Sequence, residues 1–150
     1  MPSMIIEEEI IFDATPEQVW KLLIDPKFTR QYMFGCEIVS EWKIGSDFLW
    51  NGKTEDGKEI CYVSGKLLAY EEGKILRCSM FDPNSDMEDI QQNYVNLSYQ
   101  ISTSDKSTKL KVIQGDFQGA ANGPKRYEES KSGWQEFVIP TMLKLMAAFD

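Results

Sequence analysis

The middle of the chain, residues 35 to 115, is divided at short intervals by turn-forming residues into segments of strand character. Turn sequences such as Glu55-Asp56-Gly57-Lys58 and Glu71-Glu72-Gly73 favour hairpins between these segments. The candidate strands are residues 38–42, 48–50, 60–70, 74–81, 94–102 and 110–114. Because consecutive strands joined by short turns pair in opposite directions, this region predicts an antiparallel sheet.

A strand and two short helices are expected before this region. Residues 5 to 14 alternate between two faces, as in a half-buried strand. Its more apolar face holds Ile6, Glu8, Ile10, Phe12 and Ala14. Thr15-Pro16-Glu17-Gln18 has the form of a capping box with proline at the first helical position, so a helix is expected to begin there. Asp25-Pro26 repeats the start signal and predicts a second short helix over residues 27–32.

The last segment reads as one long helix. Asn122-Gly123-Pro124 is a helix start signal, and a helix continuing to Phe149 is about 39 Å long at ~1.5 Å per residue. Pro140 has no N–H for the carbonyl of Glu136, so a bend is expected in this turn. The apolar stripe comprises Trp134, Phe137, Val138, Thr141, Met142 and Leu145, at spacings of three and four.

This order of elements predicts the fold class. A strand, two short helices, a run of antiparallel strands and one long helix fit an α+β helix-grip fold, in which a curved sheet wraps around the C-terminal helix. With no repeat or linker in the sequence, residues 1–150 are interpreted as a single domain. Such a sheet cannot close completely on one helix, so an apolar hollow is expected between them.

Several short motifs, taken in order, carry a resemblance to a known family. They are Ala14-Thr15-Pro16-Glu17-Gln18-Val19-Trp20, Ile24-Asp25-Pro26, Gly45-Ser46-Asp47-Phe48-Leu49-Trp50, Gly65-Lys66-Leu67 and Gly133-Trp134. The chain resembles the homologues of the activator of the heat-shock protein 90 ATPase, within the START-like helix-grip superfamily. The resemblance implies an internal cavity, often for apolar or amphipathic small molecules. It does not imply one activity, because relatives include lipid carriers, hormone receptors, cyclases and chaperone activators.

Composition excludes several classes of function. The chain has no histidine, which removes Ser-His and Cys-His nucleophile pairs and histidine-ligated metals. A net charge of -8 disfavours binding to nucleic acid and to anionic membrane surfaces. The three cysteines form no Cys-x-x-Cys pair, so neither a disulfide framework nor a zinc site is expected. A secretory signal and a long apolar span are both missing from the sequence, and the default expectation is a cytoplasmic protein.

The expected cavity is assigned from strand alternation and from the helical stripe. If Val95, Leu97, Tyr99 and Ile101 face inward, the Tyr99 hydroxyl faces inward with them. Likewise, if Leu110 and Val112 face inward, they bring Gln114 to the same face. Methionine and aromatic side chains suit a permissive apolar pocket. The candidate ligand-binding residues are Ile38, Trp50, Leu76, Met80, Val95, Tyr99, Val112, Gln114, Trp134, Phe137, Val138 and Met142.

Three functions remain open from the sequence. The first is binding of a hydrophobic or amphipathic small molecule, lipid-like or aromatic, with no cofactor and no metal. The second, suggested by the resemblance, is interaction with a heat-shock protein 90 chaperone. The third is a cyclase-like or hydrolytic enzyme without histidine, for which Glu8 and Tyr99 form the nominated acid-base pair and Cys78 lacks a basic partner. Because no catalytic constellation is recognisable, binding is favoured over catalysis.

Overall fold

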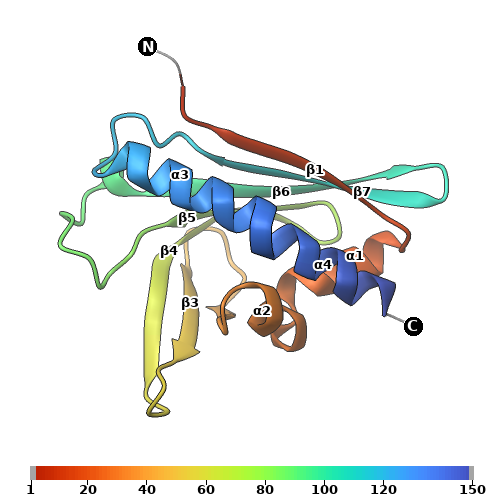
Figure 1. Cartoon of the computed structure of the whole chain (residues 1–150), viewed down its shortest axis with the longest axis horizontal. Helices are drawn as coiled ribbons and strands as arrows, with labels where there is room; N and C mark the ends of the chain where they lie inside the picture. Colours follow the sequence, from red (N-terminus) through yellow and green to blue (C-terminus); the bar gives the residue numbers. More distant parts are fainter. Residues whose placement is uncertain (1–2, 149–150) are drawn as a thin grey trace.

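A computed structural model describes residues 3–148 of the chain and shows a curved antiparallel sheet with helices on one face (Figure 1). The seven strands follow the order β1-β7-β6-β5-β4-β3-β2. Their bounds are β1 Ile6–Phe12, β2 Glu37–Ser40, β3 Asp47–Lys53, β4 Glu59–Glu71, β5 Ile75–Met80, β6 Val95–Ser104 and β7 Ser107–Gly115. The predicted α+β helix-grip fold is therefore confirmed.

The helices also follow the predicted order. They are α1 Pro16–Ile24, α2 Pro26–Tyr32, a 3-10 turn η1 Gln91–Asn93, α3 Gly123–Gly133, a π-helical segment η2 Trp134–Val138 and α4 Ile139–Ala147. The capping box is confirmed, because Thr15 Oγ1 accepts from the Gln18 N–H at 3.2 Å and Gln18 Oε1 accepts from the Thr15 N–H at 2.9 Å. Asp25 caps α2 in a similar way through the Lys27 N–H, at 3.0 Å.

The sheet bends sharply where β4 passes from one partner strand to another. The first part of β4 pairs with β3 and its last part with β5, with an irregularity between Leu67 and Ala69. At Gly65 an added Cβ would lie 1.7 Å from the carbonyl oxygen of Ser79, so glycine permits this close approach. Figure 1 shows β3 and the adjoining part of β4 turned away from β1, β6 and β7. Because of this bend, the sheet curves around the helices.

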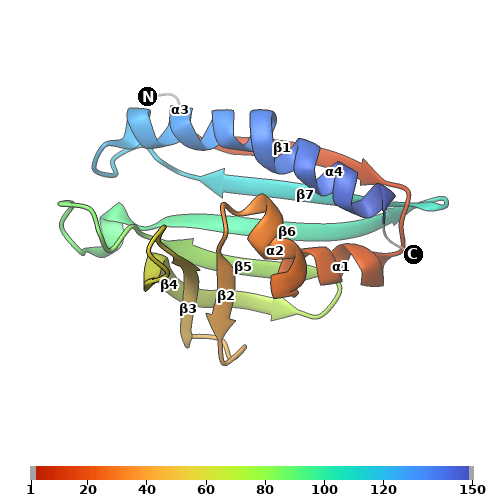
Figure 2. The same cartoon turned by 60° about the horizontal axis from the view of Figure 1, so that its bottom comes forward.

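The long C-terminal helix is confirmed, with an irregular turn in its middle. The N–H of Ile139 bonds to the carbonyl of Trp134, an i→i+5 bond, directly before Pro140. Because proline cannot supply an i→i−4 bond, the helix widens here, and its axis turns between α3 and α4 (Figure 2). Phe149, the expected end of this helix, lies outside the described residues.

The buried face of this helix repeats every four residues. Trp134, Val138, Met142 and Met146 are all 5% exposed or less. The expectation that Phe137 belongs to this face is wrong, because its side chain is 39% exposed. A helix closed by i→i+5 bonds turns less per residue than an α-helix, so a residue three positions after Trp134 lies off the buried face.

Candidate functional site

A pocket of 240 Å³ lies between the sheet and the long helix, where α3 meets the π-helical segment. Ten residues line it, most of them apolar. They are Met33, Phe34, Met80, Leu97, Gln114, Glu129, Ser130, Gly133, Trp134 and Val138. Four of these, Met80, Gln114, Trp134 and Val138, are among the residues that the sequence nominated for a cavity.

Gln114 and Trp134 form the polar centre of this pocket. Gln114 lies on β7, opposite Leu97 of β6, and is 8% exposed. The indole N–H of Trp134 donates to Gln114 Oε1 at 2.8 Å. The amide nitrogen of Gln114 faces the sulfur of Met80 at 3.7 Å. One side-chain amide thus joins the helix to the sheet.

An aromatic pair stands at the rim of the pocket. Phe34 follows α2, has a φ of +53° and is 66% exposed. Its ring stacks on that of Phe137, with the centroids 4.9 Å apart and the planes 22° apart. Although Phe137 is not on the buried face, it therefore contacts a residue that lines the pocket.

The other seven nominated residues pack in the core around this pocket. All are 9% exposed or less, and they belong to the same cluster of buried side chains. They are Ile38, Trp50, Leu76, Val95, Tyr99, Val112 and Met142. The ring of Tyr99 meets that of Trp134 edge to face, with centroids 6.2 Å apart. This contact connects the packed core to the wall of the pocket.

Burial holds the titratable groups of the core in their neutral forms. Desolvation raises the pKa of the Cys78 thiol to about 12, an effect that the Trp50 side chain partly opposes by hydrogen bonding. Desolvation also raises the pKa of the Tyr99 hydroxyl well above its usual value, and the proximity of Tyr32 and Cys78 adds to the shift. Burial therefore favours the protonated form of both groups, which makes each a weaker nucleophile or base.

The nominated pair of Glu8 and Tyr99 is separated by a strand. Glu8 pairs with Val112 across β1 and β7, and Val112 pairs with Tyr99 across β7 and β6. The two residues thus share a row but lie two strand spacings apart, about 10 Å. Glu8 instead accepts a hydrogen bond from Gln135 at 3.0 Å, toward the helix.

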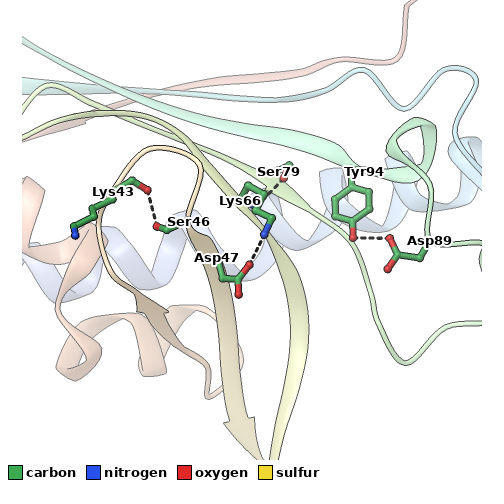
Figure 3. A network of polar contacts seen from close by, with 7 residues as sticks. All are labelled: Lys43, Ser46, Asp47, Lys66, Ser79, Asp89 and Tyr94. Carbon is green, nitrogen blue, oxygen red and sulfur yellow. Dashed lines mark hydrogen bonds and ion pairs between the residues drawn. The ribbon is translucent and has the colours of Figure 1, made fainter.

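A larger groove, of 760 Å³, lies on the outer face of the sheet and is lined by Lys66, Ser79 and Tyr94 among others. Several of its polar groups have hydrogen-bond or ion-pair partners, as Figure 3 shows. Lys66 Nζ lies 2.5 Å from an Asp47 carboxylate oxygen, and the Lys66 N–H donates to Ser79 Oγ at 2.9 Å. The Tyr94 hydroxyl donates to Asp89 at 2.6 Å, and this bond raises the pKa of Tyr94. These groups therefore already have partners.

Sequence reasoning missed six residues of the pocket between sheet and helix. Leu97 was expected to face inward but was not nominated, and Gly133 was noted for its motif alone. The remaining four are Met33, Phe34, Glu129 and Ser130. The Phe34-Gly35 sequence after a short helix is a turn signal, but nothing in it indicates that Phe34 reaches the long helix.

The described residues contain neither a membrane-spanning helix nor a cluster of metal ligands. Among residues 3–148, no helix combines the length and the apolar character needed to cross a membrane. In the same part of the chain, cysteine, aspartate and glutamate side chains nowhere gather in threes in a way that could hold a metal ion.

Comparison with solved structures supports the fold over nearly the whole chain. A protein from Cytophaga hutchinsonii is 25% identical, with a TM-score of 0.75 and coverage of 99% of this chain and 97% of that one. A Mesorhizobium loti protein is 17% identical, with a TM-score of 0.72 and coverage of 97% and 98%. An HSP90 activator from Plasmodium falciparum is 14% identical, with a TM-score of 0.68 and coverage of 96% of each chain. At such identities the last two show a common fold alone.

Comparison of sequences identifies the family. No curated protein sequence matches this chain. The sequence model of the family described as Activator of Hsp90 ATPase homolog 1-like protein matches residues 13–146, which include every strand after β1, all the helices up to Met146 and the whole pocket. The chain therefore belongs to the family of Activator of Hsp90 ATPase homolog 1-like proteins.

Proposed function

We propose that this protein binds a small apolar or aromatic molecule in the pocket between β5–β7 and the long helix. The observation that carries the proposal is the pocket itself, which places the buried pair of Gln114 and Trp134 among mostly apolar side chains. Small-molecule sites are typically of this kind, with an apolar wall and a few fixed polar groups. The family's fold, which commonly binds ligands, supports the same function.

The size of the pocket limits the ligand. An apolar cavity of about 150 Å³ is enough to hold benzene. The 240 Å³ pocket therefore suits a single substituted ring or the end of a longer chain, such as an acyl tail. The exposed ring of Phe34 at the rim gives such a molecule a further apolar contact.

Gly133 provides a way to close the pocket without disturbing the fold. It lies in helical conformation with φ -58°, and an added Cβ there meets no atom within 4 Å. Because Gly133 itself lines the pocket, we expect the larger side chain of Gly133→Leu to fill part of it. Ser132→Leu, on the exposed neighbouring position, is the matched control because it adds a similar apolar surface outside the pocket.

Native mass spectrometry and thermal-shift screening against single-ring aromatics, fatty acids and sterols test the proposal. We expect at least one class to raise the melting temperature of the wild type and of Ser132→Leu, with a much smaller shift for Gly133→Leu. If no compound binds, or if all three proteins bind equally, the pocket is not the site.

A second candidate is a chaperone partner. The family match and the likeness to the Plasmodium falciparum HSP90 activator favour this function. The -8 charge of the chain is compatible with a basic docking surface on the chaperone. Measuring ATP hydrolysis by the host's own heat-shock protein 90, with and without this protein at low salt, tests it. An increased rate supports the candidate, while an unchanged rate and no complex exclude it.

A further inference from the structure

We infer that the ligand of this pocket carries an uncharged hydrogen-bond acceptor, such as a ketone, aldehyde or ester oxygen, which is bound by the side-chain N–H of Gln114. This inference rests on the proposed function, and it names the chemistry that the pocket selects. It follows from the orientation of one amide, from the weakness of its present partner and from the charges around it.

Trp134 fixes the orientation of the Gln114 amide. An indole nitrogen can only donate, so the group that it meets at 2.8 Å must be the oxygen of the amide. The NH₂ group then points the other way, and a flip would set two donors against each other. Because both residues are buried, at 8% and 4% exposed, water has little access to rescue the flipped arrangement.

The NH₂ group has a weak partner in the described structure. It faces the sulfur of Met80 at 3.7 Å, and a thioether is a poor acceptor. Met80, Gln114 and Trp134 all line the pocket. A ligand oxygen that reaches the amide replaces a weak bond with a normal one, whereas a purely hydrocarbon ligand leaves the donor as it is.

The surrounding charges disfavour an anionic acceptor. Among the described residues that line the pocket, Glu129 is the one charged side chain. Its carboxylate lies 3.9 Å from Lys125, which is outside the lining, and both side chains are exposed, Glu129 at 66% and Lys125 at 75%. Because solvent screens the charge of Glu129, the main cost to a ligand carboxylate is the loss of its water in an apolar pocket whose described lining offers no cation. A neutral acceptor avoids this cost.

Acetophenone and α-methylstyrene make a matched pair of probes, since they have nearly the same shape and differ in an oxygen for a methylene group. Benzoate adds the charged comparison. Binding is followed by NMR through the side-chain signals of Gln114 and the indole signal of Trp134. For the wild type we expect acetophenone to bind about two- to tenfold more tightly than either of the other two, the effect of one good hydrogen bond.

Gln114→Glu, measured at alkaline pH so that the new carboxyl is ionised, provides the second test, because the carboxylate keeps an oxygen for the indole and replaces the donor by a second oxygen. We expect this variant to lose the preference for acetophenone. If it fails to fold, Met80→Leu replaces it: removing the sulfur frees the donor, and the preference for acetophenone is retained or increased. In either variant the indole signal of Trp134 reports whether the helix still contacts β7.

The outcomes distinguish a failure of the inference about the acceptor from a failure of the proposed small-molecule binding. If α-methylstyrene binds in the pocket as tightly as acetophenone, the inference about the acceptor is overturned and the proposed function stands. If benzoate binds most tightly, the inference that the acceptor is uncharged is overturned. If none of the probes binds while the screen finds no other ligand, the proposed function fails and the inference with it.

Discussion

The indole N–H of Trp134 donates to the side-chain oxygen of Gln114 at 2.8 Å, and this bond joins the long helix to β7 within the buried interior. Trp134→Phe leaves the glutamine oxygen unpaired, and Gln114→Met leaves the indole N–H unpaired. We expect each single variant to lower the free energy of unfolding by about 1–3 kcal/mol. Because either substitution already breaks the bond, the double variant should cost about 1–2 kcal/mol less than the sum of the two. Urea denaturation of all four proteins measures this coupling, and additive effects would contradict it.

Because the buried face of the helix repeats every four residues, substitutions at two adjacent positions are expected to affect stability very differently. Met142 is fully buried and Leu143 is 43% exposed. We expect Met142→Ala to lower the free energy of unfolding by about 2–5 kcal/mol, because it leaves a cavity in the core. Leu143→Ala should change it by no more than about 0.5 kcal/mol. Similar losses for the two variants would show that the helix is rotated from the position described.

Replacing Gly133 by alanine is expected to stabilise the protein. Its helical backbone tolerates a side chain, and an added Cβ meets no neighbour. We expect Gly133→Ala to raise the free energy of unfolding by about 0.4–1 kcal/mol, through the lower entropy of the unfolded chain. Thermal denaturation of this variant beside Ser132→Ala measures the effect. A loss of stability in Gly133→Ala would mean that the space beside Gly133 is occupied.

Burial of Cys78 predicts sensitivity to alkali. Its pKa is about 12 in the folded chain against a usual value of 9.0, so between these pH values the unfolded chain releases a proton that the folded chain retains. Titration of Cys78 does not affect the free energy of unfolding below pH 9.0. As the pH rises from 9.0 toward 12, it lowers that free energy by at most about 1.4 kcal/mol per pH unit. Cys78→Ala removes this contribution.

Urea denaturation at pH 8 and at about pH 10.5 checks the effect of Cys78. Tyr32 and Tyr99, whose pKa values burial also raises, add to the alkaline loss in both proteins. The wild type should therefore lose more stability than Cys78→Ala over this interval, by about 1–2 kcal/mol. Equal losses would show that the thiol is solvated in the folded chain.

Local signals in the sequence predicted most of the fold. The capping box at Thr15 needs four consecutive residues, and the alternation of Leu110, Val112 and Gln114 defines an inward face over a few positions. The sheet and the long helix follow from such short-range patterns. Strand ends were less certain: β7 begins at Ser107 rather than Leu110, because Asp105 adopts a φ of +55° and permits a tight turn.

The candidate site was predicted less completely, since it depends on contacts between distant elements. Phe137 was placed on the buried stripe because an α-helical period was assumed, and the π-helical turn before Pro140 alters that period. Phe34 lines the pocket and has a left-handed backbone conformation, with φ +53°, which is uncommon for a residue other than glycine and is not indicated by the sequence. Glu8 and Tyr99 lie on the same face of the sheet, as expected, but the distance between them depends on the order of the strands. In the folded sheet β7 lies between β1 and β6, so Val112 separates the two residues.

A crystal structure of the protein soaked with acetophenone tests the central claim most directly. Our account predicts the ligand in the pocket between β6, β7 and the long helix, with its ring beside Trp134 and its oxygen within about 3.2 Å of the Gln114 side-chain nitrogen. Ligand density in the outer groove beside Lys66 and Tyr94 instead, or an unoccupied pocket at saturating acetophenone, would contradict it.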